Sequence, residues 1–382
     1  MKRVKGLWPQ VTSFANLLAA HGKARRGKRQ REEVARFELN MERELMGLMA
    51  ELIERRYQPG RYREFTIYDR KPRQIAAAPY RDRVVHHALM RVVEPALDRR
   101  FIAACHACRV GHGVHAAVAR YQHWAQRYAY AMKLDVVRYF PSIDHARLKA
   151  KLARRSGDQH VLHLFDVIID SAPPVPVAPL PGEDLIDAMA RRSGLPIGNL
   201  TSQFLGNVYL DDLDHHLQET LRVPAYLRYV DDLIVLHDSK VALREIADEI
   251  AHWLTRDFMR LHERKRQIVP TASGLDVLGY HVWPTRRRLR PANGLRFRRR
   301  LRAMARAYHD GRLALADITP RVASWVGHAL HADTAGLRRA LFDEVVFSKG
   351  GDERTVARGS RRFVEQPTAE LAVGEPQQER LR

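Results

Sequence analysis

The chain has 382 residues, 45% of them hydrophobic, which is enough to build a core shared by two or three subdomains. Its 65 lysines and arginines exceed the 44 aspartates and glutamates, and the net charge of +21 favours a polyanionic partner, with nucleic acid ahead of an acidic membrane surface. The longest apolar runs stay well below about 18 residues, which argues against a transmembrane helix. The two cysteines cannot form a disulfide framework, which indicates a reducing cytoplasm.

Residues 1–60 are expected to form a basic helical extension. The run HGKARRGKRQRE at 21–32 predicts a solvated surface helix or a flexible arm, and in so basic a chain we expect it to contact phosphates. Residues 38–56 carry apolar side chains at helical spacing. A proline and polar residues break the apolar stretch near the N-terminus, so a secretory signal is not expected.

The next predicted elements are a hairpin, a long helix and a strand. Residues 62–79 alternate apolar and polar side chains around Lys-Pro-Arg, which predicts a β-hairpin, and residues 81–101 carry the apolar stripe of an amphipathic helix. The stretch AMKLDVVRYF at 131–140 predicts a strand. A helix capped by Ser142 or Asp144 should follow it.

The second half of the chain is predicted to alternate between helices and hairpins. Proline-rich residues 171–185 predict a surface loop, and YLRYVDDLIVLH at 226–237 predicts a buried hairpin. The other predicted elements are a turn leading into a helix at 194–218, a helix at 241–259, an apolar hairpin at 275–284 and basic helices from 286 to about 348. The residues after these lack apolar periodicity, so we expect them to be disordered.

Three aspartates lie among apolar strand residues. Asp231 and Asp232 interrupt the predicted hairpin, and Asp135 stands 96 residues upstream in the predicted strand. Buried carboxylates gathered in one place would repel each other unless a cation neutralised them. Magnesium prefers oxygen ligands, and two ions about 4 Å apart can activate a hydroxyl and stabilise a leaving pyrophosphate. We therefore expect two Mg²⁺ ions here, although the Asp-Asp pair alone also fits an ordinary hairpin turn.

Six motifs in a fixed order resemble the reverse transcriptase family, from about residue 62 to residue 341. They are KPRQI, LDVVRYF, LPIGNLTSQ, YVDD, the lysine of HERKRQI, and LGYHVWP. The resemblance implies RNA-directed DNA polymerase activity and an α+β fold shaped like a right hand, with an antiparallel palm sheet backed by helices. The expected parts are an N-terminal extension at 1–60, fingers at 61–130, a palm at 131–285 with a loop insertion at 171–193, a helical thumb at 286–348 and a disordered tail at 349–382.

The resemblance also implies catalytic roles. Asp135 would be the first metal ligand, with the backbone carbonyl of Val136 as a further ligand. Asp231 would bridge the two magnesium ions, and Asp232 would support it. Lys265 would protonate the leaving pyrophosphate as a general acid, although several neighbouring basic residues are alternatives.

Further residues are expected at the incoming nucleotide and the primer. Lys71 and Arg73 match fingers residues that clamp the triphosphate, for which a guanidinium is well suited; the alternative is a solvated hairpin charge. Phe140 matches an aromatic gate that would exclude ribonucleotides, and its alternative is core packing. Residues 278–284 match the primer grip, an apolar hairpin against which the primer end rests.

The stretch LPIGNLTSQ departs from most reverse transcriptases, which have Gln where this chain has Ile197 and Ser-Pro where it has Ser-Gln. With Gly198 and Gln203, and with the stretches PYRDRVVHHAL, ACRVGHGVHAA and SWVGHALHADT, it resembles the enzymes of diversity-generating retroelements. Those enzymes copy a template RNA and misincorporate opposite adenines. Replacing an amide by a branched alkyl group removes a hydrogen-bonding group, and a missing contact changes discrimination by only about 1–3 kcal/mol, so looser discrimination is expected.

The biological role has an alternative. Related anti-phage defence reverse transcriptases, which use an associated non-coding RNA, share much of this palm, and the long polar C-terminus favours them. Either role predicts a structured template RNA, the RNA–DNA duplex and dNTPs as partners. The retroelement role adds a small basic accessory protein, and the defence role adds self-association. Two other functions are open: an RNA-dependent RNA polymerase, against which Phe140 argues, and an inactive RNA-binding scaffold, against which the three carboxylates argue.

One group of cysteines and histidines invites a zinc interpretation. Cys105, Cys108, His112 and His115 are residue types that zinc accepts. Only three residues separate the second cysteine from the first histidine, which leaves little chain to wrap a tetrahedron, so a zinc site is not expected. The histidine pair at 86–87 is expected to pack or to contact template rather than to bind metal.

Overall fold

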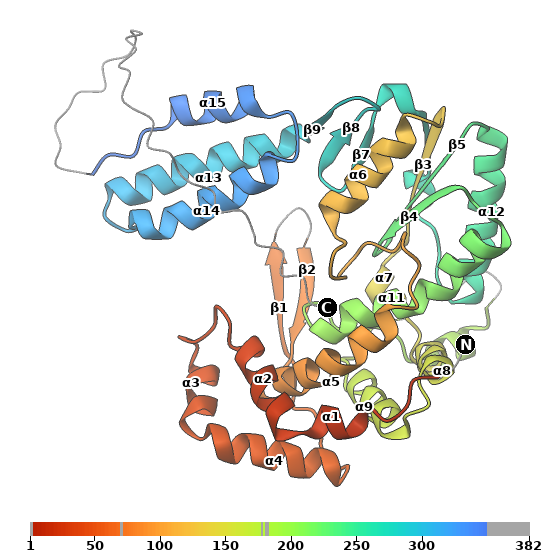
Figure 1. Cartoon of the computed structure of the whole chain (residues 1–382), viewed down its shortest axis with the longest axis vertical. Coiled ribbons are helices and arrows are strands. Elements are labelled where there is room, and N and C mark those ends of the chain that lie inside the picture. Colours follow the sequence, from red (N-terminus) through yellow and green to blue (C-terminus); the bar gives the residue numbers. More distant parts are fainter. Residues whose placement is uncertain (1–2, 69–71, 177–178, 180–182, 350–382) are drawn as a thin grey trace, which may run out of the picture.

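The computed structural model describes residues 3–68, 72–176, 179 and 183–349 (Figure 1). Within these residues, helices combine with three antiparallel sheets, as the α+β prediction requires. Apart from residue 349, the tail predicted to be disordered lies outside the described residues. Among the residues described, no helix is both long and apolar enough to cross a bilayer.

The N-terminal region is a group of helices at one end of the molecule (Figure 1). They are α1 (Trp8–Thr12), α2 (Phe14–Ala24), α3 (Glu32–Leu39) and α4 (Met41–Ile53). Most of the stretch at 38–56 is helix α4, but it is not one continuous helix, because Asn40 leaves the helical region (φ −125°, ψ 31°) and separates α3 from α4. The basic run is neither one helix nor a free arm: it contains the last turn of α2 and a turn that leads to α3.

The predicted hairpin and the helix after it are both present. Strands β1 (Arg63–Tyr68) and β2 (Pro72–Ala77) pair antiparallel, and the hairpin projects toward the C-terminal helices (Figure 1). Helix α5 (Tyr80–Asp98) packs against α2 on one side and against α11 (Leu200–His215) on the other.

The central sheet has four antiparallel strands in the order β4-β5-β3-β6. They are β3 (Tyr130–Asp135), β4 (Ala225–Tyr229), β5 (Asp232–His237) and β6 (Gln267–Pro270). The strand predicted over 131–140 is too long: β3 ends at Asp135, Arg138 adopts a left-handed φ of 46°, and a short helix, α7 (Tyr139–Ser142), follows. The chain therefore turns away from the sheet directly after a predicted metal ligand.

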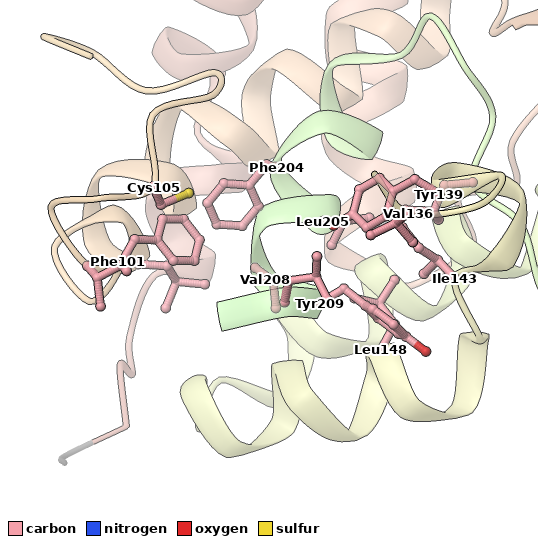
Figure 2. Packing of buried hydrophobic residues seen from close by; sticks show 14 of the residues in the cluster. Phe101, Cys105, Val136, Tyr139, Ile143, Leu148, Phe204, Leu205, Val208 and Tyr209 are labelled. Atoms are coloured by element: carbon pink, nitrogen blue, oxygen red, sulfur yellow. The ribbon is translucent and has the colours of Figure 1, made fainter. Parts of the chain in front are cut away.

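Helix α11 runs through the core beside this sheet. It is buried on nearly all sides, as expected of a helix surrounded by protein. Figure 2 shows Phe204, Leu205, Val208 and Tyr209 packed between neighbouring segments; the Phe204 ring lies 5.6 Å from that of Phe101. The other helices of this region are α6 (Val114–Ala125), α8 (His145–Arg155), α9 (Gln159–Asp170), α10 (Leu185–Ala190) and α12 (Lys240–Arg256).

Two details of this region differ from or refine the sequence predictions. Asp144, rather than Ser142, caps α8, because its carboxylate accepts the Arg147 N–H at 2.8 Å. The predicted loop insertion contains the short helix α10, which Asp184 caps by accepting the Ile186 N–H at 2.8 Å.

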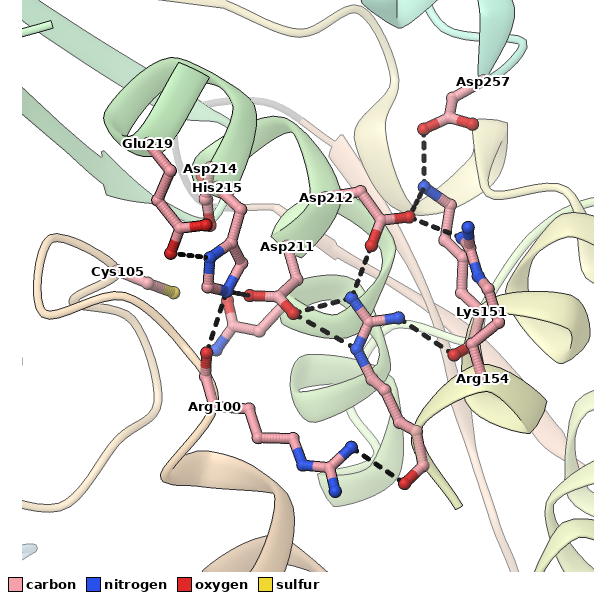
Figure 3. A network of polar contacts seen from close by, with 12 residues as sticks. Arg100, Cys105, Lys151, Arg154, Asp211, Asp212, Asp214, His215, Glu219 and Asp257 are labelled. Carbon is pink, nitrogen blue, oxygen red and sulfur yellow. Dashed lines mark hydrogen bonds and ion pairs between the residues drawn. The ribbon is translucent and has the colours of Figure 1, made fainter. Parts of the chain in front are cut away.

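A buried ionic network fastens α8 to α11 (Figure 3). Lys151 donates to Asp257 at 2.7 Å and to Asp212 at 3.2 Å. Arg155 contacts Asp211 at 2.6 Å and Asp212 at 2.7 Å. Removing one partner would leave a buried charge without compensation, so this network holds the C-terminal parts of α8 and α11 against each other.

The C-terminal region joins a small sheet to a helical unit. Its elements are β7 (Leu275–Val277), β8 (Tyr280–Val282), β9 (Arg287–Leu289), α13 (Pro291–His309), α14 (Leu315–Ala329) and α15 (Ala335–Glu344). The prediction of helix from residue 286 is wrong at β9, which pairs with β8 because its alternation buries Leu289. The three helices share their own small core, formed by Phe297, Leu301, Met304, Ile318 and Leu341.

Candidate active site

The three predicted carboxylates meet at one end of the central sheet. Asp135 ends β3 and Asp232 begins β5, and the two residues are direct cross-strand partners. Asp231 lies in the turn between β4 and β5, where its carbonyl accepts the Val136 N–H at 3.2 Å. Sheet pairing thus gathers carboxylates that are 96 residues apart in sequence.

Asp231 carries the electrostatic cost of this arrangement. Burial raises the pKa of its carboxyl group to about 6, and the nearby charges of Asp232 and Asp135 act in the same direction. A carboxyl group whose charged form is disfavoured in this way gains from a nearby cation. The site therefore has the electrostatic character expected of a cation-binding site.

Two lysines partly neutralise the other carboxylates. Lys265 Nζ lies 2.6 Å from Asp135 Oδ2. Lys133 Nζ lies 3.1 Å from Asp232 Oδ1, and it also approaches the carbonyl of Asp276 at 3.4 Å. Sequence reasoning missed Lys133, although its position two residues before Asp135 places both side chains on the same face of β3.

The donor set fits a hard divalent cation, whose preferred ligands are carboxylate and carbonyl oxygens. Within the described part of the chain, no three His, Cys, Asp or Glu side chains are placed close enough to hold one ion. Asp135 and Asp232 instead form ion pairs with Lys265 and Lys133, respectively.

The turn that carries Asp231 has an unusual backbone. Val230 has a φ of 57°, in the left-handed region, which a β-branched residue occupies at a cost of about 1–3 kcal/mol. Such a conformation persists only where the surroundings hold it. Sequence reasoning did not detect this strain, nor the buried Arg228 whose guanidinium donates to the Val230 carbonyl at 3.2 Å.

A second group of predicted residues meets in the loop before α11. The Leu195 N–H donates to the Phe140 carbonyl at 2.9 Å, and the Ile197 carbonyl accepts the Ala76 N–H of β2 at 3.2 Å. Gly198 has a φ of 112°, and a Cβ there would lie 3.1 Å from Ile75, so glycine suits both its backbone and its surroundings. The loop therefore connects Phe140 to the hairpin strand that carries the predicted triphosphate residue.

Asn199 strengthens this connection and was missed from the sequence. Its buried side chain accepts the Ala78 N–H at 3.3 Å and donates to the Ala76 carbonyl at 3.2 Å. Asparagine is a common cap at a helix start, and α11 begins at the next residue, but this side chain bonds to β2 and the residue after it instead. Asn199 thus ties the root of the hairpin to the core.

The remaining predicted nucleotide residues are accessible to different degrees. Phe140 is half-buried, with its ring 5.3 Å from that of Tyr139, so part of it stays free to meet a ligand. Arg73 on β2 and Gln203 in the first turn of α11 are exposed. Lys71 lies outside the described residues.

The cysteines and histidines weighed for zinc have separate surroundings. Cys105 is buried, and its sulfur accepts from Arg228 at 3.4 Å, whereas Cys108 is exposed. His115 stacks on His331 with ring centroids 3.5 Å apart. Of the adjacent histidines at 86–87, the first is buried and the second is half-buried, and burial is the main cause that lowers the pKa of each to about 4.

One family model matches more than half of this chain. The family model described as reverse transcriptase (RNA-dependent DNA polymerase) matches residues 68–282. Protein YkfC of Escherichia coli K12 is 24% identical over 279 residues, which cover 63% of this chain and 71% of YkfC. Two apo telomerase structures from Candida tropicalis, one truncated from its C-terminal domain, match at 13% and 11% identity with TM-scores of 0.46 and 0.45. These matches cover 60% and 59% of this chain and about half of each telomerase chain, 55% and 48%.

Proposed function

Because the chain belongs to the reverse transcriptase family, and is thus an RNA-directed DNA polymerase with a right-hand fold, we propose that it copies a dedicated structured RNA into cDNA and misincorporates opposite template adenines. This is the behaviour of reverse transcriptases from diversity-generating retroelements. The proposal also assigns the parts of the hand: an N-terminal extension at 1–60, fingers at 61–130, a palm at 131–285 with a loop insertion at 171–193, a thumb at 286–348 and a tail at 349–382.

Asp135, Asp231 and Asp232, with the Val136 carbonyl, would hold two Mg²⁺ ions in this proposal. When bound, the ions would supply activation of the primer 3′-hydroxyl and stabilisation of the departing pyrophosphate. Lys265 would donate a proton to the pyrophosphate, and its contact with Asp135 supports a place at the reacting groups. Arg73 and Lys71 would bind the triphosphate, and residues 278–284, in and beside the β7–β8 hairpin, would support the primer end.

A basic surface outside the catalytic centre supports RNA as the partner. The α2–α3 turn and α5 bring together Lys28, Arg31 and Arg83, and Arg83 pairs with Glu33 of α3 at 2.9 Å. Burial lowers the pKa of the Lys28 amine and the charges of Arg83 and Arg31 lower it further, whereas Glu33 acts in the opposite direction, so the repulsion among these three cations is offset only in part. Phosphate groups of a folded RNA would relieve that repulsion.

The proposed misincorporation opposite template adenines rests on the position of Ile197 in the loop before α11. Ile197 lies in the segment whose hydrogen bonds run to Phe140 on one side and to β2 on the other, which is where the incoming nucleotide would be held. An alkyl side chain offers that nucleotide or its template partner no hydrogen bond. The site then discriminates by shape alone, and discrimination by shape is weak when the alternatives are similar in size.

Ile197→Gln tests this proposal. We expect misincorporation opposite template adenines to fall by about tenfold, because the amide restores a hydrogen-bonding group, while the rate on matched template stays within a few fold. Sequencing of cDNA made on one defined RNA measures both quantities, and errors opposite the other three bases serve as the internal reference. Ile197→Val, which keeps the alkyl character, is the matched control. Equal adenine error frequencies in wild type and Ile197→Gln would contradict the proposal.

The second candidate role is anti-phage defence with an associated non-coding RNA. The long polar C-terminal sequence favours it. In the retroelement role a small basic accessory protein would be the partner, and in the defence role other copies of the chain. Both roles place the protein in the cytoplasm.

A further inference from the structure

The turn between β4 and β5 contains a residue in a strained backbone conformation, which other groups must stabilise. Val230 stands between Tyr229, the last residue of β4, and Asp231, and its φ of 57° is the left-handed conformation that branched side chains disfavour. Its carbonyl belongs to the peptide group that continues into Asp231. The orientation of that peptide therefore sets the direction from which the Asp231 side chain enters the site.

The guanidinium of Arg228 forms a hydrogen bond to this peptide group. Arg228 donates from Nη1 to the Val230 carbonyl at 3.2 Å and from the same nitrogen to the Asn207 side chain at 3.3 Å. Its other nitrogen atoms bond to the Asp214 carboxylate at 2.6–3.0 Å, and Nη2 also contacts the Asn207 carbonyl and the Cys105 sulfur. All three nitrogens of the group are thus engaged, and only one of these bonds goes to the turn.

The guanidinium itself is held rigidly. Arg228 and Asp214 are both 0% exposed at the side chain, and Tyr226 donates a further hydrogen bond to Asp214 at 2.6 Å. Although burial disfavours the charge, the Asp214 carboxylate and its hydrogen bonds, together with Cys105 and Tyr139, raise the pKa of Arg228 well above its usual value. The Arg228 backbone is fixed as well, by hydrogen bonds of 2.9 Å to Ala104 and from His106.

We propose that Arg228 is a positioning residue for DNA synthesis: anchored by Asp214 on α11, it holds the Val230 carbonyl and thereby keeps Asp231 in its catalytic orientation. The turn is then clamped from two sides, because the Asp231 carbonyl also accepts the Val136 N–H from the β3 side. Rate depends steeply on such placement, and a shift of about 1 Å can cost about 100-fold. The inference rests on the proposed catalytic role of Asp231.

The same helix provides a matched control pair. Arg155 is also buried, at 8% exposure, and it also bonds to a carboxylate of α11, Asp211, at 2.6 Å. Its other partners are Asp212 and the carbonyl of Lys151 in α8, so it fastens helices to each other and does not contact the turn. A role of Arg228 in folding alone predicts that the two arginines respond alike to replacement.

The test compares Arg228→Lys with Arg155→Lys in the full chain. Both variants keep the charge but lose the planar fork, so both should lower the melting temperature. We expect Arg228→Lys to lower kcat by about 100-fold while the KM for dNTP and the Kd for RNA change less than about threefold. We expect Arg155→Lys to keep kcat within about threefold of wild type. Equal losses of kcat in the two variants, or an unchanged kcat in Arg228→Lys, would overturn the inference.

Two further measurements keep the result interpretable. If Arg228→Lys does not fold, Asn207→Ala is used instead, because it removes only one hydrogen-bond partner of the same Nη1 nitrogen. This variant should lower kcat by about tenfold with an unchanged KM. An unchanged kcat would then overturn the inference. Asp231→Asn is assayed alongside. An active Asp231→Asn would refute the proposed site itself, whereas an inactive Asp231→Asn beside a fully active Arg228→Lys would refute the role of Arg228 alone.

Discussion

Asp231→Asn is expected to abolish DNA synthesis on an RNA template, with a loss of at least about a thousandfold in rate. An amide keeps the size of the side chain but removes the negative charge that would hold the divalent ions, and metal charge stabilisation contributes several kcal/mol to such reactions. The affinity for RNA should change little, because we propose that the basic surfaces, and not Asp231, contact the phosphates. Primer extension with dNTPs and an RNA binding assay measure the two effects.

The melting temperature of the Asp231→Asn variant provides a second test of the same residue. The Asp231 carboxylate is disfavoured by burial and by two neighbouring carboxylates, so without added metal the asparagine variant should melt at or above the wild-type temperature. Asp238→Asn is the matched control, since Asp238 follows the other end of the same strand and bonds to the Ala129 N–H at 2.9 Å. That variant should keep its polymerase activity. Undiminished synthesis by Asp231→Asn would remove the catalytic assignment of the whole sheet end.

Phe140→Ala is expected to lower the preference for dNTPs over NTPs by about 10–100-fold. A ring that lies against the sugar excludes the 2′-hydroxyl by its size, and a contact of this kind contributes about 1–3 kcal/mol to discrimination. The half-buried ring and the hydrogen bond from the Leu195 N–H to the Phe140 carbonyl place this residue beside the Ile197 loop. Single-nucleotide incorporation with each dNTP and NTP measures the ratio.

Phe101→Ala is the control for loss of packing. Phe101 is buried and its ring packs on Phe204, so its truncation should cost stability, by about 3–5 kcal/mol, without changing the sugar preference. If Phe140→Ala is destabilised in the same way and its dNTP preference is unchanged, Phe140 is a packing residue. A wild-type enzyme that prefers NTPs would contradict the gate assignment as well.

The gathering of the three carboxylates in the candidate site could be predicted because its signals are local or ordered along the chain. Apolar residues on both sides of Asp231 and Asp232 predict the hairpin, and the upstream Asp135 follows an apolar strand of its own. The order of six motifs then brings these segments into one family pattern. Nothing in these signals depends on knowing which segments touch.

The residues that were missed depend on contacts between distant segments. Asn199 looks like a helix cap, but the hairpin strand lies close enough to take its side chain, and β9 forms because β8 offers it a partner. Arg228 could have been found by the reasoning used for the aspartates. It is a charge in an apolar strand, two residues before the strained Val230, and it therefore needs a buried partner, which is Asp214.

The measurement that tests the account most directly is the cDNA that the protein makes on the RNA it brings from its host. The protein is purified with bound RNA, supplied with dNTPs and Mg²⁺, and both the RNA and the new DNA are sequenced, with Asp231→Asn as the inactive reference. We predict cDNA complementary to one structured RNA, with substitutions confined to template adenines. A faithful or repetitive cDNA from a compact non-coding RNA would contradict the retroelement role and favour defence, and the absence of any templated DNA would contradict the account as a whole.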